Sequence, residues 1–333
     1  MNLRLLSVHA HPDDESSKGA ATLARYAAEG VEVLVVTCTG GERGDIQNPA
    51  ADRPGVRENL GAVRRAELAR ACEILGVRHH LLGHLDSGLP AGHPLPPLPE
   101  GCFADRPLDQ TAGELVRVVR EFRPHVMLTY DPNGGYPHPD HIACHRISAA
   151  AFEAAGDGAR YPGAGRPWQP AKLYYHVGGS HPERISALRA ELLGRGTDFS
   201  CPELSAKLAL LWQHDATTLL PITTRVPCGE WFETRFRALR AHETQIDPEG
   251  FWFVHPPELL RAAWPTEDYH LARSTVPVEL PEDCLFAGVT VETGPASRTE
   301  GADRTTAGRT TADRTHSDTT ATALTEGLAD VLH

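Results

Sequence analysis

The first 155 residues alternate between short apolar runs and longer segments in which apolar residues recur at helical spacing. Four segments read as strands: residues 3–10, 31–41, 77–88 and 125–130. Residues 31–41 form a continuous β-branched run, and 77–88 is the weaker strand. The helical segments between them, the first of which covers residues 16–30, end near Gly or Pro, which commonly terminate helices. This alternation predicts a parallel sheet with helices on its faces, because consecutive parallel strands need a crossover connection.

The fold class that we predict is therefore α/β, with a Rossmann-like parallel sheet flanked by helices. Residues 1–165 are expected to form the catalytic core, and residues 166–291 mix strands, helices and Pro-rich turns. We expect this second portion to belong to the same domain and to complete a substrate pocket. It includes a further helix, which is predicted over residues 203–215. Residues 292–333 consist largely of Thr, Ala, Arg, Asp and Gly, a composition typical of a disordered tail.

Composition excludes several classes of function. The 333 residues carry a net charge of −12, whereas nucleic-acid binding usually needs a basic face. No apolar stretch reaches the length of about 20 residues that spans a bilayer, so no membrane contact is expected. The seven cysteines form no C-x-x-C pair, and no secretory signal is evident at the first residues. We therefore expect a cytoplasmic protein with reduced thiols.

Three polar clusters occur where predicted strands end. The first is HPDDE at 11–15, the second is GHLDSG at 83–88, and the third is YDPNGGYPHPDH at 130–141. Carboxyl ends of parallel strands share one edge of a sheet, which is where such sheets bind ligands. Two His with one carboxylate is a known catalytic arrangement for zinc and also for Fe²⁺. The residues alone leave open whether His138, His141 or His145 is the second imidazole ligand.

HPDDE together with GGYPHPDHI resembles the LmbE/PIG-L family of zinc-dependent deacetylases, over residues 3 to about 255. The resemblance implies one Zn²⁺ per chain, held by His11, Asp14 and His141; Fe²⁺ suits the same ligands. It implies that Asp13 is the general base. It also implies that His138 stabilises or protonates the tetrahedral intermediate, that Asp140 orients His138, and that Tyr136 polarises the oxyanion.

Five longer segments, among them TGGERGDIQNPA and HETQIDPEGFWF, resemble the branch of this family that hydrolyses mycothiol S-conjugates. The implied reaction cleaves the cysteinyl–glucosamine amide of this small-molecule substrate, and yields a mercapturic acid and glucosaminyl-inositol. One alternative is deacetylation of N-acetylglucosaminyl-inositol. Another is an amidase that trims a mycothiol adduct in natural-product biosynthesis. Lys18 and the segment FWF favour the amidase, and the oligomeric state stays open.

Substrate contacts are predicted for five side chains, and for Lys18, Arg64, Asp86 and His242 an ordinary structural role is the alternative. Lys18 is either near the conjugate or solvated. Arg64 either contacts the sugar or forms an ion pair with Glu67 on the same helix face. Asp86 either binds a sugar hydroxyl or caps the DSG turn. The remaining two candidates are Glu42 and His242.

Overall fold

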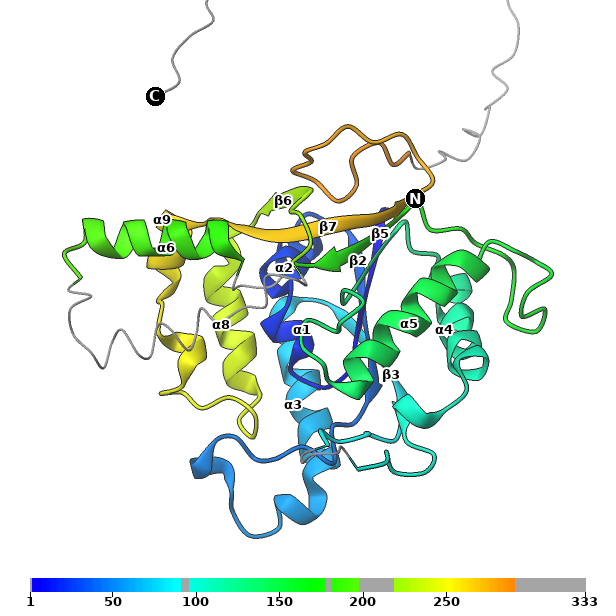
Figure 1. The fold of residues 1–333 in the computed structure, drawn as a ribbon, viewed down its shortest axis with the longest axis horizontal. Coiled ribbons are helices and arrows are strands. Elements are labelled where there is room, and N and C mark those ends of the chain that lie inside the picture. The colour runs from blue at the N-terminus through cyan, green and yellow to red at the C-terminus, as the bar shows by residue number, and fades with distance from the viewer. Residues whose placement is uncertain (1, 91–95, 178–180, 198–218, 291–333) are drawn as a thin grey trace, which may run out of the picture. The chain divides into compact units, whose positions relative to one another are not determined.

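The computed structural model describes residues 2–90, 96–177, 181–197 and 219–290. These residues contain one seven-stranded sheet with the strand order β3-β2-β1-β4-β5-β7-β6 (Figure 1). The strands are β1 Arg4–His9, β2 Glu32–Thr39, β3 Arg78–His84, β4 Val126–Thr129, β5 Lys172–His176, β6 Thr224–Pro227 and β7 Thr266–Ser274. Strands β1 to β5 run parallel, and β7 runs antiparallel to both β5 and β6. The predicted α/β class with a parallel sheet is confirmed.

The helices occupy both faces of the sheet. They are α1 Asp14–Ser17, α2 Ala20–Ala28, α3 Leu60–Leu75, α4 Leu108–Phe122, α5 Pro139–Ala154, α6 Pro182–Gly194, α8 Phe232–Ala241 and α9 Pro257–Ala263. Among these described helices, none combines the length and apolar character that crossing a bilayer requires. A helix predicted over 203–215 and the predicted tail at 292–333 lie outside the described residues.

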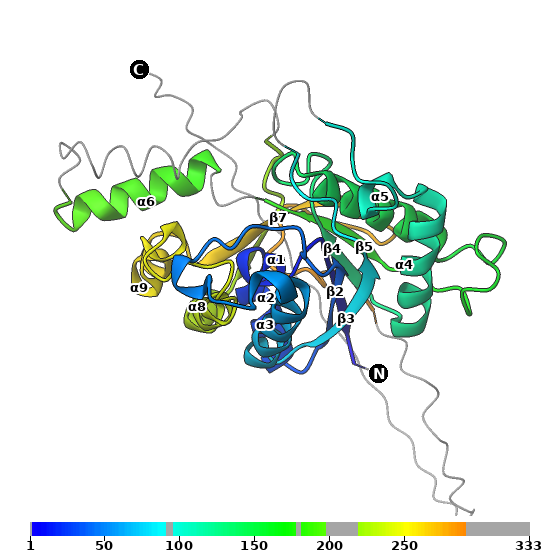
Figure 2. The ribbon, with the colours of Figure 1, turned by 90° about the horizontal axis from the view of Figure 1, so that it is seen from below.

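Two apolar cores fill the space between the sheet and its helices. Alternate residues of β1 point to opposite faces, as the pleat of a strand requires. Leu6 and Val8 belong to a core that α4 and α5 complete, whereas Leu5 belongs to a core that α2 and α3 complete. Figures 1 and 2 show these helix pairs on opposite sides of the strands. Burial on both faces explains why the strands read as continuous apolar runs.

One predicted helix, over residues 16–30, is divided in the structure. Helix α1 ends at Ser17, Lys18 is extended, and α2 begins after Gly19. Gly19 has φ +80°, and a Cβ atom at this position would lie 2.8 Å from Cε1 of His176 on β5. The chain therefore needs a glycine here, and the break turns Lys18 away from the course of a continuous helix.

The strand order reverses between β1 and β4. From β1 the chain proceeds to β2 and β3 on one side, and then returns to β4 and β5 on the other. Such a switch point opens a crevice at the carboxyl ends of the two central strands, where open α/β sheets bind their ligands. The segments that follow β1 and β4 hold the HPDDE and PHPDH motifs, so both motifs meet at this crevice.

Candidate metal centre and active site

Three histidines and two aspartates converge at the switch point. The ring of His11, which follows β1, lies 4.7 Å from the ring of His138 and 5.3 Å from that of His141. Ligand atoms of these three residues lie within 4.8 Å of one another, as do those of His11, Asp86 and Asp140. All five side chains are buried. The crevice therefore concentrates nitrogen and oxygen donors that suit a divalent metal.

His141, near the start of α5, is oriented by a short glycine-rich loop. Its Nδ1 donates to the carbonyl of Gly134 over 2.9 Å, while its buried Nε2 has no hydrogen-bond partner among the described residues. Gly134 has φ +75°, and a Cβ atom there would lie 2.5 Å from the Cβ of His141. An imidazole whose other nitrogen donates to a carbonyl presents a free lone pair, which is how metal-binding histidines are usually held.

Asp14 bridges the two histidines that the family resemblance assigns as ligands. Its Oδ2 lies 3.5 Å from Nδ1 of His11 and 3.5 Å from Nε2 of His141, and it also accepts from the His11 backbone N–H at 2.9 Å. Lys18 donates to Oδ1 at 2.7 Å. Burial alone would raise the pKa of Asp14, but Lys18 and the two histidines hold it well below its usual range.

His11 is surrounded by carboxylates. Its Nε2 lies 3.3 Å from Asp140 and 3.7 Å from Asp86. Burial opposes protonation of the ring, yet the contacts to Asp14, Asp140 and Asp86 outweigh it and raise its pKa well above its usual value. The negative potential that favours a proton here also favours a cation. This potential, together with the unpartnered Nε2 of His141, fits a bound divalent metal.

Asp13 has the strained backbone that is common at functional sites. Its φ is +116°, in the left-handed half of conformational space that non-glycine residues rarely adopt. Its carboxylate retains 24% exposure and lies 3.5 Å from Nη2 of Arg64. Burial, opposed by Arg64 and reinforced by the charge of Asp14, raises its pKa to about 6. A carboxylate of this pKa accepts a proton readily near neutral pH.

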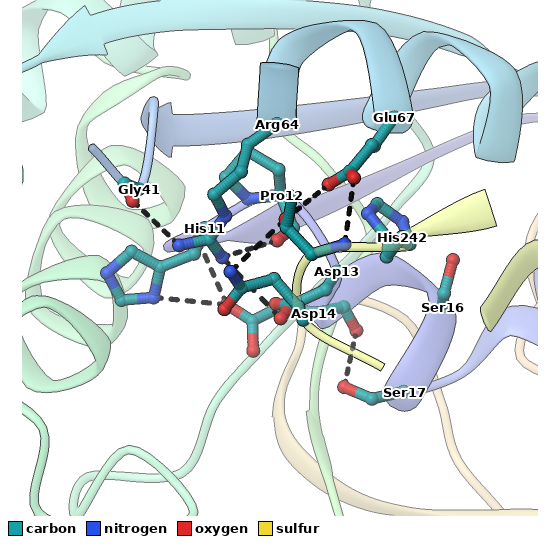
Figure 3. A network of polar contacts seen from close by, with 12 residues as sticks. His11, Pro12, Asp13, Asp14, Ser16, Ser17, Gly41, Arg64, Glu67 and His242 are labelled. Atoms are coloured by element: carbon teal, nitrogen blue, oxygen red, sulfur yellow. Dashed lines mark hydrogen bonds and ion pairs between the residues drawn. The ribbon is translucent and has the colours of Figure 1, made fainter. Parts of the chain in front are cut away.

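Arg64 holds the loop that carries Asp13. Its two Nη atoms donate to the carbonyls of Gly41 and Pro12, each over 2.7 Å (Figure 3). Among the described residues no ion pair joins Arg64 to Glu67, so that alternative is wrong. Glu67 instead accepts from the backbone N–H and the hydroxyl of Thr244, at 2.9 and 2.7 Å. Arg64 thus fixes the positions of two backbone segments at the site.

Glu15 and His242 form a buried pair behind Asp13. The two side chains meet at 2.7 Å, and the other carboxylate oxygen of Glu15 accepts from the backbone N–H of Asp13 at 3.0 Å. Burial works against both charges, but each partner favours the ionised form of the other, so the pKa of His242 is raised and that of Glu15 is lowered. His242 therefore supports the base loop from beneath, where the predicted role was substrate contact.

His138 caps helix α5 at the edge of the cluster. Its Nδ1 accepts the backbone N–H of Asp140 at 3.1 Å, which leaves Nε2 to carry the ring hydrogen. Burial and the neighbouring His11 lower its pKa to about 4. The Asp140 carboxylate accepts from the backbone and hydroxyl of Ser87 and contacts His11. The backbone N–H of Asp140 therefore orients His138. The carboxylate of Asp140 instead binds Ser87 and contacts His11.

Asp86 and Glu42 tie together the loops after β3 and β2. Asp86 accepts from the backbone N–H groups of Gly88 at 2.8 Å and Arg43 at 3.0 Å, so it does cap the DSG turn. Glu42 accepts from the backbone N–H of Asp86 at 2.9 Å. Burial would raise the pKa of Asp86, but the contact with His11, and after it the bonds from Gly88 and Arg43, hold this pKa well below its usual range. Both carboxylates border the side of the cluster that faces β2 and β3.

Tyr136 is the exposed member of the group. It keeps 47% of its surface accessible, and its ring lies 4.6 Å from that of His141.

Two residues of this group had no role predicted from the sequence. Tyr130 stacks on His141 at 4.5 Å and its hydroxyl accepts from the backbone N–H of Ala10; Ser87 holds the Asp140 carboxylate. Both residues lie at strand ends within the polar clusters, and this position in the sequence could have identified them as members of the site.

The fold and the site together define the class of this protein: a parallel α/β sheet with a candidate metal centre at its switch point. The family model PIG-L, GlcNAc-PI de-N-acetylase, matches residues 6–152. The mycothiol S-conjugate amidase of Streptomyces coelicolor is 55% identical over 290 residues, which cover 86% of this chain and 97% of that protein. The chain belongs to the PIG-L (LmbE) family.

A second relative and a solved structure agree with this placement. The 1D-myo-inositol 2-acetamido-2-deoxy-alpha-D-glucopyranoside deacetylase of Streptomyces avermitilis is 42% identical over 280 residues, covering 81% of this chain and 92% of that protein. The N,N'-diacetylchitobiose deacetylase of Pyrococcus horikoshii has a TM-score of 0.55, with 17% identity and 87% of each chain covered. The latter likeness shows the shared fold alone.

Proposed function

We propose that this protein is a metal-dependent amide hydrolase that cleaves the cysteinyl–glucosamine amide of mycothiol S-conjugates. The observation that carries the reaction class is a strained Asp13 of raised pKa that directly precedes Asp14, the carboxylate in contact with His11 and His141. The choice of substrate is supported by the relative of 55% identity, which has the name of that activity. The products would be a mercapturic acid and glucosaminyl-inositol.

His11, Asp14 and His141 are the residues that would hold the metal, with Zn²⁺ as our first choice and Fe²⁺ as the second. The unpartnered Nε2 of His141 and the Asp14 oxygen shared by both histidines support this set. When bound, a divalent metal polarises the amide carbonyl and makes water a better nucleophile at neutral pH. The protein supplies the remaining groups.

Asp13 takes a proton from water as the water oxygen bonds to the amide carbon. Arg64 and the hydrogen bond from the Asp13 backbone to Glu15 hold the carboxylate in place for this step. When the tetrahedral intermediate collapses, the carbon–nitrogen bond breaks and the amine needs a proton. Protonated Asp13 returns the proton that it took, so the reaction consumes one water and leaves the enzyme unchanged.

His138 and Tyr136 are placed to stabilise the negative oxygen of the intermediate. The Nε2–H of His138 and the hydroxyl of Tyr136 are hydrogen-bond donors at the same mouth of the cluster, where the two rings lie 6.0 Å apart. Preorganised donors of this kind are worth about 10²–10³ in rate. Because His138 accepts the Asp140 N–H on Nδ1, it acts as a neutral donor.

The alternative is deacetylation of N-acetylglucosaminyl-inositol, supported by the relative of 42% identity. A biosynthetic amidase acting on a mycothiol adduct would break the same bond as our first choice. Lys18 bears on the choice, because it donates to Asp14 and also lines a cavity on the β5 and β7 side of the cluster. An acetyl group would leave that cavity empty.

The test is direct comparison of both substrates with the metal-loaded protein. We expect an S-alkylated mycothiol to be cleaved faster than N-acetylglucosaminyl-inositol, with release of amine followed by mass spectrometry. A chelator should abolish turnover, and added Zn²⁺ should restore it. Faster cleavage of the acetyl sugar would place the protein among the deacetylases. Turnover that persists in chelator would contradict the metal-dependent mechanism.

A further inference from the structure

A cavity of about 200 Å³ adjoins the metal-centre cluster on the side of β5 and β7. It shares Lys18, Tyr130 and Tyr136 with the site that we have described. Its lining also includes Arg184 from α6, Arg235 from α8 and Trp252. Its volume is below the range of about 300–1,000 Å³ for sites that hold whole drug-sized ligands, so it suits a substituent of a larger molecule.

Three carboxylates also line this cavity, those of Asp131, Glu267 and Asp268, and each already accepts hydrogen bonds from the protein. Asp131 accepts from the backbone N–H groups of Asn133 and Gly135, at 2.6 and 3.3 Å. Glu267 on β7 accepts from the backbone N–H groups of Ala21 and Thr22, at 3.2 and 2.8 Å, and so caps the start of α2. Asp268 accepts from Trp264 and Thr266, each at 2.7 Å. Each of these carboxylates therefore already accepts two hydrogen bonds from protein donors.

The donors of the cavity are less completely used. Arg235 donates to the carbonyl of Ser17 at 3.3 Å, but its buried Nε has no hydrogen-bond partner among the described residues. The buried Nε2 of His176, which lines the same cavity, likewise lacks one in that part of the chain. Burial and the neighbouring Arg235 lower the pKa of Arg184. The guanidinium groups of Arg184 and Arg235 are the cationic donors of this cavity, and they fit a ligand with acceptor oxygens.

The position of the cavity relative to the cluster indicates that it would receive one half of a substrate cleaved at the centre. The strand order places β2 and β3 on one side of β1 and β4, and β5 and β7 on the other. Glu42 and Asp86 border the β2–β3 side, whereas the cavity lies on the β5–β7 side. An amide cleaved at the centre would therefore extend its amine half and its acyl half to opposite sides of the cluster.

We propose that this cavity binds the acyl half of the substrate, an N-acetylcysteine whose sulfur bears an apolar substituent. This inference rests on the proposed function, and it assigns Arg235, Arg184 and Trp252 to specificity. The N-acetyl oxygen accepts from the guanidinium groups, and the S-substituent packs against the indole of Trp252. An acyl group with an acceptor oxygen and an apolar arm matches the donors and the aromatic wall.

The inference is tested with two conjugates that differ only in the sulfur substituent, S-benzyl and S-methyl mycothiol. Arg235→Ala should lower kcat/KM for both about tenfold, the loss typical of one hydrogen bond to a charged group. Trp252→Ala should lower the preference for S-benzyl over S-methyl about tenfold, with S-methyl turnover nearly unchanged. Arg237→Ala, an exposed arginine on the same helix, is the matched control and should resemble the wild type.

Folding is checked for every variant by its melting temperature, and Arg235→Lys retains the charge if Arg235→Ala fails to fold. If the wild type cleaves the conjugates but the Arg235 and Trp252 variants match Arg237→Ala, the cavity assignment is overturned while the function stands. If the wild type cleaves neither conjugate, the proposed function fails, and the cavity assignment fails with it.

Discussion

Two buried polar clusters in the same sheet differ in how completely their atoms are paired. The first is the metal-centre cluster at the switch point. The second, which we call the β5 cluster, consists of Lys172, Tyr174 and Glu282. In the β5 cluster Lys172 is paired with Glu282 and contacts Tyr174, and Tyr174 donates to Glu282 at 2.6 Å. Thr224 donates to the same carboxylate at 3.3 Å, so its oxygens are shared among three donors.

In the metal-centre cluster, by contrast, not every buried polar atom is paired. The Nε2 of His141 has no hydrogen-bond partner in the described part of the chain, although Asp14 lies 3.5 Å away, and Asp13 has a strained backbone. A buried cluster in which every polar atom is paired holds secondary-structure elements together, because removal of one partner leaves an uncompensated buried charge. Clusters that keep an unpartnered atom and a strained residue are typical of sites that await a ligand. We therefore expect mutations in the metal-centre cluster to lower turnover, and mutations in the β5 cluster to lower stability.

The largest expected effect is on turnover, at Asp13. Asp13→Asn removes the base without changing the shape of the side chain, so kcat should fall about 10²–10⁴-fold. Metal content, measured by plasma mass spectrometry, should be retained, and the melting temperature should not fall. Asp45→Asn, an exposed aspartate in the loop after β2, is the control. Wild-type turnover by Asp13→Asn would remove Asp13 from the mechanism.

The β5 cluster should show the opposite response, a loss of stability with intact chemistry. Glu282→Ala leaves the buried Lys172 without its counter-charge, and this should lower the free energy of unfolding by about 3–5 kcal/mol. Urea unfolding measures the loss, and kcat per folded molecule should stay unchanged. The double variant Lys172→Met with Glu282→Leu removes both charges and should recover much of the stability. If the double variant is no more stable than Glu282→Ala, uncompensated charge is not the cause.

A smaller effect on turnover is expected at Glu15, which touches no substrate and acts through Asp13. Glu15→Gln introduces N–H groups where the Asp13 backbone and His242 both donate, so the base loop should shift and kcat should fall about tenfold. KM should change little. The matched control is Glu67→Gln, since Glu67 binds Thr244 on the same side of the site. Equal loss of kcat in both variants would show a general structural effect instead of positioning of Asp13.

The parallel strands of the sheet could be predicted because each one is recognised from its own stretch of sequence. Each strand is an apolar run, and each motif follows its strand directly, so the convergence of His11, Asp86 and His141 follows from parallel topology alone. The ligand set and the base came from the family resemblance, and they stay predictions. The division of α1 from α2 was missed, because an isolated glycine in a helical pattern is usually tolerated. The constraint on Gly19 is the ring of His176, far away in the sequence.

The supports of the site could not be predicted for the same reason. Glu15 pairs with His242, Glu67 with Thr244, and Glu267 with the start of α2. Each joins the first part of the chain to a segment after residue 240, and no periodicity or spacing specifies such partners. Glu15 lies in the first turn of α1, where a carboxylate is favourable to the helix dipole without any distant partner. Nothing local in the sequence therefore indicates its pairing with His242.

The smallest expected effect concerns His125, which lies at the start of β4 next to the β5 cluster. Its Nδ1 accepts the backbone N–H of Arg4 at 3.1 Å, and burial, with Arg4 as a second cause, lowers its pKa below the ordinary 6.5. Below pH 6.5 the unfolded chain therefore binds a proton that the folded chain refuses, and stability falls as the pH falls. Above pH 6.5 both states are neutral, and no such loss occurs.

His125→Asn removes this titration, so its melting temperature should fall less than that of the wild type between pH 7.5 and pH 5. The difference should be about 2 °C or less, because one partly buried imidazole contributes little in a chain of this size. His79→Asn, an exposed histidine on β3, should retain the wild-type pH dependence. A steeper pH dependence in His125→Asn would mean that the ring is charged in the folded state. The surroundings of the β5 cluster would then contain an unpaired charge. The β5 cluster and the metal-centre cluster would therefore differ less in how completely their polar groups are paired.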